Sequence, residues 1–211
     1  MFQSIEILQK LTTEKITAVV RGKTYEEAHS IAKGCIEGGI KSIEVTFTTP
    51  NALKLISVLK EEYKDAIIGA GSVLDSETAR LAILNGAEYV VSPCFDEGAA
   101  RTCNRYQIPY IPGCMTIKEI KDATEFGIVL IKLFPGNNFS PSMIKAIKGP
   151  LPTVEVMPTG GVNLENLHVW FENGACSVGV GSDFNKALAT NGQNGVVDLS
   201  QQYIKRVQEL T

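Results

Sequence analysis

Short runs of β-branched and other apolar residues alternate with longer amphipathic stretches along the whole 211-residue sequence. Such alternation is typical of repeated strand–helix units built on a parallel sheet. Eight runs fit strands, at residues 17–21, 42–47, 66–71, 89–92, 110–112, 129–134, 154–158 and 177–180. Helical stretches lie between them, among them 25–37, 51–63, 76–85 and 164–172. The spacing of roughly 25 residues per unit predicts a minimal (β/α)8 barrel.

We expect one domain over residues 1–211, an α/β fold of the (β/α)8 TIM-barrel type with an extra N-terminal helix. Glycines at 38–39, 86 and 174 follow helical stretches, where glycine suits the position just after a helix. No low-complexity tract divides the sequence. The alternative is an open doubly wound sheet, which usually has fewer strands.

Composition excludes several classes of protein. With 44% hydrophobic and 20% charged residues, the chain has the balance of an ordinary globular protein. Its net charge of −3, with basic residues scattered along the sequence, offers no positive surface to nucleic acid. Neither a signal peptide nor an apolar run of membrane-spanning length is evident, so we expect a cytoplasmic protein without a membrane partner.

The cysteines and histidines favour neither disulfides nor a metal site. Five cysteines, odd in number and irregularly spaced, predict free thiols. Two of them, Cys94 and Cys114, follow predicted strands and are interpreted as passive lining, because no histidine is placed to activate them. Both histidines fall in helical stretches, so we expect no metal bound by histidine.

Lys132 lies inside the apolar run 128–135, close to the carboxyl end of a predicted strand. In barrels of this kind the active site forms at the carboxyl ends of the strands. Burial of a lysine favours its neutral amine, and only the neutral amine adds to a carbonyl group. From this run alone, a lysine that extends out of the barrel to solvent is an equally good interpretation.

Glu44 interrupts the second predicted strand, which faces the sixth, that of Lys132, across an eight-stranded barrel. Period-two alternation puts Glu44 on one face with Thr46, and Lys132 on one face with Phe134. Both charged groups can therefore point inward and meet. The alternative is a structural ion pair, but a buried ion pair is often no more stable than apolar residues, so we favour catalysis.

Glycine-containing turns end the last two predicted strands and carry Thr159, Gly160, Gly161, Gly181 and Ser182. Loops at these positions of a barrel often bind phosphate through backbone N–H groups and a helix N-terminus. Either turn alone is weak evidence. Their placement on adjacent strands predicts a phosphate site.

Arg21 closes the first predicted strand, next to the eighth. Its guanidinium can bind a carboxylate or a phosphate with two hydrogen bonds, and the alternative is an exposed residue at the edge. Ser72 and Ser92-Pro93 follow the third and fourth strands. Their hydroxyls suit either substrate binding or turn formation.

Six segments, in order along nearly the whole chain, together resemble one known family. They are Glu44-Val45-Thr46, Gly69-Ala70-Gly71-Ser72-Val73-Leu74, Val91-Ser92-Pro93, Ile111-Pro112-Gly113, Ile131-Lys132-Leu133-Phe134-Pro135 and Pro158-Thr159-Gly160-Gly161-Val162-Asn163. The sequence resembles 2-keto-3-deoxy-6-phosphogluconate (KDPG) aldolase, also called KDPG/4-hydroxy-2-oxoglutarate aldolase. Six ordered segments are far more specific than any one motif.

The resemblance implies a homotrimeric class I aldolase that cleaves the phosphorylated keto acid KDPG to pyruvate and D-glyceraldehyde 3-phosphate, without a metal or an organic cofactor. It implies that Lys132 forms the Schiff base and that Glu44 is the general acid and base. The residues expected to hold the pyruvate part of the substrate are Arg21, Thr46, Ser72, Pro93 and Phe134. The residues expected to bind phosphate are Thr159, Gly160, Gly161, Gly181 and Ser182.

One departure from the family pattern concerns a substrate-binding arginine. Many members carry an arginine two residues after the E-V-T motif, where this sequence has Thr48. Another branch carries arginine at the end of the first strand, as this sequence does at Arg21. Our hypothesis is that Arg21 supplies the missing charge.

Two other kinds of function remain as alternatives to the aldolase. A phosphosugar epimerase or isomerase would share the phosphate loops but would not need a Schiff-base lysine, and a non-catalytic phosphate-binding barrel would need neither Lys132 nor Glu44. Within the family, KDPG, its galactonate epimer and 4-hydroxy-2-oxoglutarate all suit the same chemistry.

Overall fold

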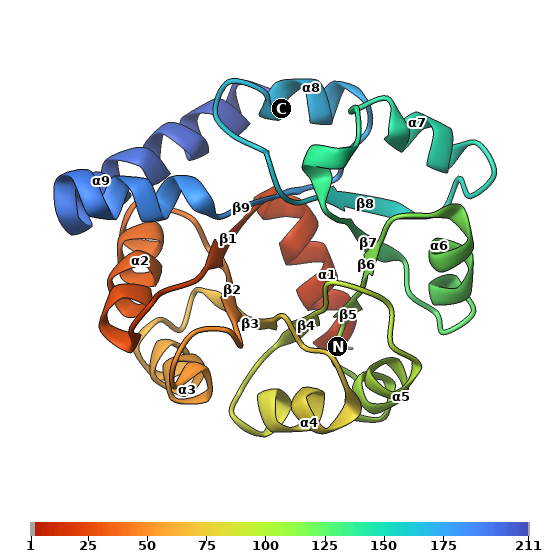
Figure 1. Ribbon diagram of the computed structural model, residues 1–211, viewed down its shortest axis with the longest axis horizontal. Coiled ribbons are helices and arrows are strands. Elements are labelled where there is room, and N and C mark those ends of the chain that lie inside the picture. Colours follow the sequence, from red (N-terminus) through yellow and green to blue (C-terminus); the bar gives the residue numbers. More distant parts are fainter. Residues whose placement is uncertain (1–2, 211) are drawn as a thin grey trace.

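The computed structural model describes residues 3–210 and is an α/β fold with a curled parallel sheet (Figure 1). The strands are β1 (Ile16–Val20), β2 (Ser42–Thr46), β3 (Ile67–Gly71), β4 (Tyr89–Val91), β5 (Tyr110–Ile111), β6 (Gly113–Cys114), β7 (Leu130–Leu133), β8 (Glu155–Pro158) and β9 (Val178–Val180). The helices are α1 (Gln3–Glu14), α2 (Tyr25–Glu37), α3 (Ala52–Glu62), α4 (Ser76–Leu84), α5 (Glu97–Tyr106), α6 (Ile117–Thr124), α7 (Met143–Lys148), α8 (Leu167–Glu172) and α9 (Ser182–Gln208), with a 3-10 turn at Gly136–Asn138.

The strands form two hydrogen-bonded sheets that curve around a common centre, with most of the helices outside them (Figure 1). One sheet has the order β5-β4-β3-β2-β1-β9 and the other the order β6-β7-β8, and every strand pair in them is parallel. A single parallel bridge between Thr159 and Gly179 connects the end of β8 to β9. The carboxyl ends of all these strands therefore lie on one face.

Each of the eight predicted runs contains a strand whose ends lie within one residue of the predicted bounds, and two further differences have a clear physical cause. In the run 110–112, β5 ends at Ile111 because Pro112 has no N–H to donate, and the chain continues as β6 directly after this proline. The predicted helix 164–172 begins only at Leu167, because the Asn163 side chain accepts the N–H groups of Glu165 and Asn166 and forms a turn first.

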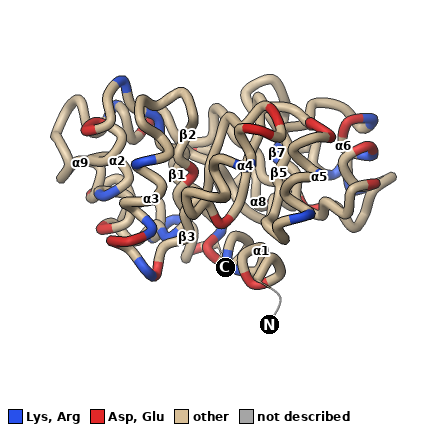
Figure 2. The backbone as a smooth tube through the Cα atoms, turned by 90° about the horizontal axis from the view of Figure 1, so that it is seen from below, with Lys and Arg blue, Asp and Glu red and all other residues tan. Residues whose placement is uncertain are grey.

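Apolar side chains fill both sides of the sheet. The larger cluster packs between the strands and the surrounding helices. The smaller one lies inside the curve of the strands and consists of Ile7, Leu11, Ile67, Tyr89, Val91, Ile111, Leu130 and Met157. Two of these, Ile7 and Leu11, are one helical turn apart on α1, so this helix covers the amino-terminal end of the strands (Figure 2). The opposite, carboxyl end remains open.

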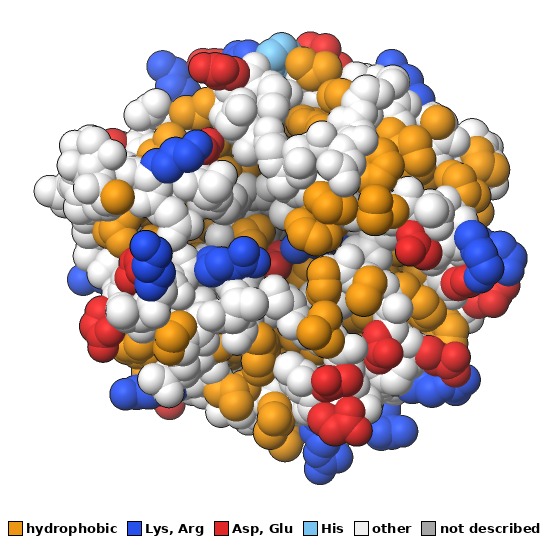
Figure 3. Space-filling view, viewed as in Figure 1, with side chains coloured by type: hydrophobic (Ala, Val, Ile, Leu, Met, Phe, Trp, Pro, Cys, Tyr) orange, Lys and Arg blue, Asp and Glu red, His pale blue; other side chains and the backbone are white. Residues whose placement is uncertain are grey.

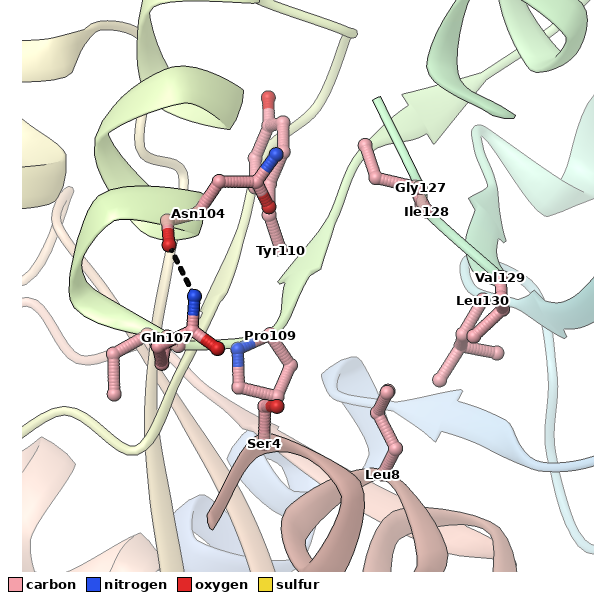
Figure 4. Close-up of a pocket in the computed structure, with 11 residues that line it drawn as sticks. Ser4, Leu8, Asn104, Gln107, Pro109, Tyr110, Gly127, Ile128, Val129 and Leu130 are labelled. Atoms are coloured by element: carbon pink, nitrogen blue, oxygen red, sulfur yellow. Dashed lines mark hydrogen bonds between the residues drawn. The ribbon is translucent and has the colours of Figure 1, made fainter. Parts of the chain in front are cut away.

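A small pocket of about 120 Å³ lies where α1 meets the loops before β5 and β7 (Figure 4). Its lining includes Ser4 and Leu8 of α1, and Gln107 donates from Nε2 to the Asn104 carbonyl at 2.8 Å. None of the predicted site residues lines it. Within residues 3–210, no helix combines the length and apolar character that a membrane crossing requires.

Candidate active site

Lys132 and Glu44 form a buried ion pair at the carboxyl end of the strands. The Nζ of Lys132, on β7, lies 3.1 Å from Oε1 and 3.4 Å from Oε2 of Glu44, on β2. The residues are 5% and 1% exposed. The Nζ also lies 5.2 Å from the centre of the Phe134 ring, the distance of a cation–π contact. Lys132 therefore points inward, and the interpretation that it extends out to solvent is wrong.

Strand β3 makes room for this pair through glycine. A Cβ atom on Gly71 would lie 2.1 Å from Oε1 of Glu44, so the carboxylate packs directly on the backbone of β3. A Cβ atom on Gly69 would lie 2.3–2.5 Å from three ring atoms of Tyr89. Because residues 69 and 71 have no side chains, an aromatic ring and a carboxylate can both pack against this strand.

The Thr46 hydroxyl, predicted to lie at the pyruvate site, links the ends of β1 and β2. It donates to the Val20 carbonyl at 3.1 Å and lies 3.1 Å from the Thr48 hydroxyl and 3.4 Å from that of Thr49. Thr49 in turn accepts from the backbone N–H of Gly22 at 3.2 Å. Thr46 is buried at the level just above Glu44, and its hydrogen bonds fix the backbone that precedes Arg21.

Ser72 and Pro93 follow β3 and β4 at the same face. Ser72 is half-buried and has a φ of 60°, in the left-handed region that residues other than glycine adopt rarely. A Cβ atom on Gly113 would lie 2.2 Å from the Pro93 carbonyl oxygen, so the backbones of these two residues are in contact. The preceding hydroxyl, on Ser92, donates to the Cys94 carbonyl within the turn after β4 and lies 2.7 Å from the Tyr110 hydroxyl.

A second hollow, of about 250 Å³, brings together all five predicted phosphate-binding residues. These five are Thr159, Gly160, Gly161, Gly181 and Ser182. Two residues predicted for the pyruvate site, Arg21 and Phe134, also line the hollow. The four lining residues that were not predicted are Val19, Val162, Gly179 and Asn185. Figure 3 shows a hollow at the centre of this face, with a basic side chain at its edge. Phe134 joins the two parts of the site, because its ring lines this hollow and also contacts Lys132.

Backbone conformation shapes this hollow. Gly160 and Gly161 have φ values of 98° and 75°, which favour glycine. The missing side chain of Gly179 makes space for Thr159, since a Cβ atom there would lie 2.3 Å from the Thr159 Oγ1. That hydroxyl is buried and makes no hydrogen bond to any group of residues 3–210. Ser182 begins α9, whose first N–H groups have no acceptor within the helix.

Arg21 and Asn185 lie at the edge of the same hollow. The Arg21 side chain is exposed, and within the part of the chain that the structure describes no carboxylate pairs with its guanidinium. Asn185 donates from Nδ2 to the Arg21 carbonyl at 2.8 Å and thereby ties the end of β1 to α9. The sequence held a signal for Asn185, because it lies three residues after Ser182 and so on the same face of the helix.

Three of the five cysteines, Cys35, Cys103 and Cys114, are buried. Burial raises the pKa of Cys35 and of Cys103 to about 12, and it raises that of Cys114 to the same value. Such thiols stay protonated near neutral pH. Across residues 3–210, no group of three or more histidine, cysteine, aspartate or glutamate side chains is placed to hold a metal ion.

A buried amine beside a carboxylate at the carboxyl ends of parallel strands is the arrangement of an enzyme that forms a Schiff base with its substrate. The chain belongs to the family of KDPG and KHG aldolases, whose family model matches residues 7–197. It is an aldolase, and the expectation drawn from the six sequence segments is confirmed at this level.

Named relatives cover most of the chain. A 2-dehydro-3-deoxy-phosphogluconate aldolase of Treponema pallidum is 38% identical over 77% of this chain and 78% of its own. A 2-dehydro-3-deoxy-6-phosphogalactonate aldolase of Escherichia coli is 34% identical over 85% and 89%. A crystal structure of KDPG aldolase from Legionella pneumophila, with pyruvate captured as a covalent carbinolamine, matches with a TM-score of 0.79 and 29% identity, over 89% of this chain and 92% of that one.

Proposed function

We propose that this aldolase cleaves KDPG to pyruvate and D-glyceraldehyde 3-phosphate through a Schiff base on Lys132. The observation that carries the proposal is the 3.1 Å contact between the buried Lys132 amine and the Glu44 carboxylate. Transfer of a proton from the ammonium to this carboxylate leaves a neutral amine that can add to a ketone. The carbinolamine captured in the relative from Legionella pneumophila is the product of such an addition to pyruvate.

The reaction then needs only one acid and base. Lys132 attacks the C2 ketone, and the carbinolamine loses water, with Glu44 moving the protons, to give an iminium ion. Glu44 next accepts the proton of the C4 hydroxyl, and the C3–C4 bond breaks as its electrons move into the iminium group. The aldehyde leaves, and an enamine remains. Protonation at C3 and hydrolysis release pyruvate and restore Lys132, so the iminium serves as the electron sink and no metal or organic cofactor is required.

The substrate's phosphate would bind in the hollow between β8 and α9. Gly160, Gly161 and Gly181 allow the phosphate to approach the backbone closely, and the N–H groups at the start of α9 near Ser182 point toward an anion there. Thr159 also lines this hollow, and its buried hydroxyl has no hydrogen-bond partner within residues 3–210. Arg21, which follows β1 and is predicted for the pyruvate part of the substrate, also lines this hollow, where its charge would attract the carboxylate or the phosphate.

Thr46, Ser72, Pro93 and Phe134 are proposed to surround the pyruvate part of the substrate. The support is strongest for Phe134, whose ring contacts the Lys132 ammonium. The other three lie at the carboxyl ends of β2, β3 and β4. The named relatives include phosphogluconate and phosphogalactonate aldolases and KHG/KDPG aldolases, so the galactonate epimer and 4-hydroxy-2-oxoglutarate are alternative or additional substrates.

We further propose that residues 1–211 form a single domain, a closed (β/α)8 barrel with α1 as its extra N-terminal helix. Two observations support closure: β5 and β6 continue each other across Pro112, and a bridge from Thr159 to Gly179 links β8 to β9. A homotrimer in the cytoplasm is proposed from the family. One structure with 30% identity and a TM-score of 0.85, covering 93% of this chain and 73% of that one, is a cage designed by fusing symmetric oligomeric domains. Light scattering on the purified protein measures the assembly.

The decisive experiment treats the protein with pyruvate and sodium borohydride, followed by peptide mass mapping. We expect one reduced pyruvate adduct, on Lys132, and none in the Lys132→Arg variant, which keeps the charge but cannot form the imine. Absence of an adduct in the unmodified protein would exclude Schiff-base chemistry. Pyruvate release from KDPG, its galactonate epimer and 4-hydroxy-2-oxoglutarate, followed with lactate dehydrogenase, then ranks the substrates.

A further inference from the structure

Tyr89 lies in the same row of residues as Glu44, on the inner side of the sheet. In the register of the parallel strands, Glu44 of β2 pairs with Gly69 of β3, and Gly69 pairs with Tyr89 of β4. Paired residues of neighbouring strands point to the same side of a sheet. The phenol and the carboxylate are therefore separated only by a residue without a side chain.

The ring of Tyr89 fills the space above that glycine. A Cβ atom on Gly69 would lie within 2.5 Å of three ring atoms, so the ring lies flat against β3 and extends toward β2. The Glu44 carboxylate lies over Gly71 instead, one inward-facing position nearer the open end, where the corresponding distance to Oε1 is 2.1 Å. On the inner side of β3, the Tyr89 ring therefore covers Gly69, and the Glu44 carboxylate covers Gly71, nearer the carboxyl end of the strand.

Hydrogen bonds hold the ring in this position. The Tyr89 hydroxyl lies 3.1 Å from the Ser42 hydroxyl, which lies 2.9 Å from that of Thr17. All three residues are 0% exposed. Burial raises the pKa of Tyr89 well above its usual value, and the nearby Glu44 carboxylate raises it further. The phenol stays neutral and spans from β4 to β2 beneath the ion pair.

We propose that Tyr89 is a positioning residue of the aldolase: its ring closes the space beneath Glu44 and keeps the carboxylate raised against Lys132. A glutamate side chain has three rotatable bonds and would otherwise be free to turn toward the amino-terminal end, away from the amine. The ring removes those orientations. This inference rests on the proposed Schiff-base function, because it concerns the geometry of the acid and base in that reaction.

The test uses pyruvate alone, so that phosphate binding plays no part. Exchange of the pyruvate methyl protons in D₂O, followed by NMR, reports proton transfer by Glu44 after the imine forms. Borohydride trapping counts the molecules in which Lys132 can form an imine with pyruvate. We expect Tyr89→Leu, which removes most of the ring, to slow exchange per trappable site at saturating pyruvate at least ~10-fold, since misplacing a catalytic group by about 1 Å can cost 10²-fold.

Matched variants separate positioning from stability. Tyr89→Phe keeps the ring and should exchange within about threefold of the unmodified protein. Tyr89→Met, whose flexible side chain fills the space without fixing it, should behave like Tyr89→Leu. The control is Trp170→Leu, which removes a large buried aromatic side chain from the outer cluster on α8 and should leave exchange per trappable site unchanged.

Three results would overturn the inference: normal exchange in both Tyr89→Leu and Tyr89→Met, an equal loss in Trp170→Leu, or a loss in Tyr89→Phe as large as in Tyr89→Leu. Normalising to trapped sites removes any fraction that fails to fold. Failure of the proposed function looks different, because the unmodified protein would then trap no pyruvate at all.

Discussion

Because the Glu44 carboxylate packs directly on Gly71, a methyl group added at residue 71 tests whether the position of this carboxylate matters for catalysis. In Gly71→Ala the new Cβ atom would lie 2.1 Å from Oε1, 2.6 Å from Cγ and 2.7 Å from Cδ of Glu44. Real Cβ contacts essentially never fall below 3.0 Å, so Oε1 must move by at least about 0.9 Å. Gly71 has no positive φ, so the substitution tests this contact rather than backbone strain.

The expected size of the effect follows from that displacement. The Lys132 Nζ lies 3.1 Å from Oε1 and 3.4 Å from Oε2 of Glu44, and a shift of the carboxylate by about 1 Å away from the amine takes both oxygens beyond hydrogen-bonding distance. Misplacing a catalytic group by about 1 Å can cost 10²-fold, and a general base contributes roughly 10²–10⁴-fold in all. We therefore expect kcat for KDPG cleavage to fall about 10²-fold.

The measurement is the steady-state rate of pyruvate release, with the unfolding midpoint of each variant recorded in parallel. Gly149→Ala is the control, because a Cβ atom there meets its nearest neighbours only at 3.5 and 3.8 Å. It should keep full activity. If Gly71→Ala retains kcat within about threefold, then either the carboxylate adapts or its position against Lys132 does not limit the reaction, and the reasoning is refuted.

Four further predictions test other parts of the molecule. Arg21→Ala should raise KM for KDPG about 10- to 100-fold with little change in kcat, the effect of losing one charge-assisted hydrogen bond, and unchanged affinities for KDPG and pyruvate would rule out our hypothesis for this residue. Thr159→Val should raise KM for KDPG but not for 4-hydroxy-2-oxoglutarate, which lacks the phosphate; equal effects on both would argue against a phosphate contact. A thiol reagent at pH 8 should label the exposed Cys94 rapidly and Cys35 only after unfolding, since burial raises the pKa of the latter to about 12. Asp75→Ala should lower the free energy of unfolding at pH 7 by about 1 kcal/mol, because Asp75 caps α4 through the Thr78 N–H. Its hydrogen bond lowers the carboxyl pKa, so this difference should be full above the ordinary carboxyl range and disappear as the pH falls through the lowered pKa, as denaturation at several pH values would measure.

The sequence was sufficient for the parts of the site that depend on strand periodicity. Alternation along two strands predicted that Glu44 and Lys132 point inward, and their contact is present. Glycine turns on adjacent strands predicted that Thr159 and Ser182 approach each other, and both line one hollow. In each case the inference needed only the direction of a side chain and the order of the strands. The roles assigned to these residues stay predictions.

Contacts that cross a glycine were not predictable in the same way. Tyr89 reaches Ser42 over β3 only because residue 69 lacks a side chain, and a strand pattern counts Tyr89 simply as an apolar inward residue. The spacing from Ser182 was enough to place Asn185 on the same helix face, but its hydrogen bond was not predictable, because the partner is the backbone carbonyl of Arg21. Periodicity gives the direction of a side chain but neither its reach nor its backbone partners.

The groups that surround Lys132 and Glu44 explain why a lysine and a glutamate lie inside this core. Two buried charges cost desolvation energy, and apolar residues of similar volume often stabilise a fold as well or better. Here the surroundings are also adapted to the pair, because Gly71 leaves room for the carboxylate and the Phe134 ring makes a cation–π contact with the ammonium. A contribution to stability alone does not account for both adaptations, because replacing the pair would make them unnecessary. Chemistry at the amine accounts for them, since a lysine kept out of water beside a proton acceptor is ready to form an imine.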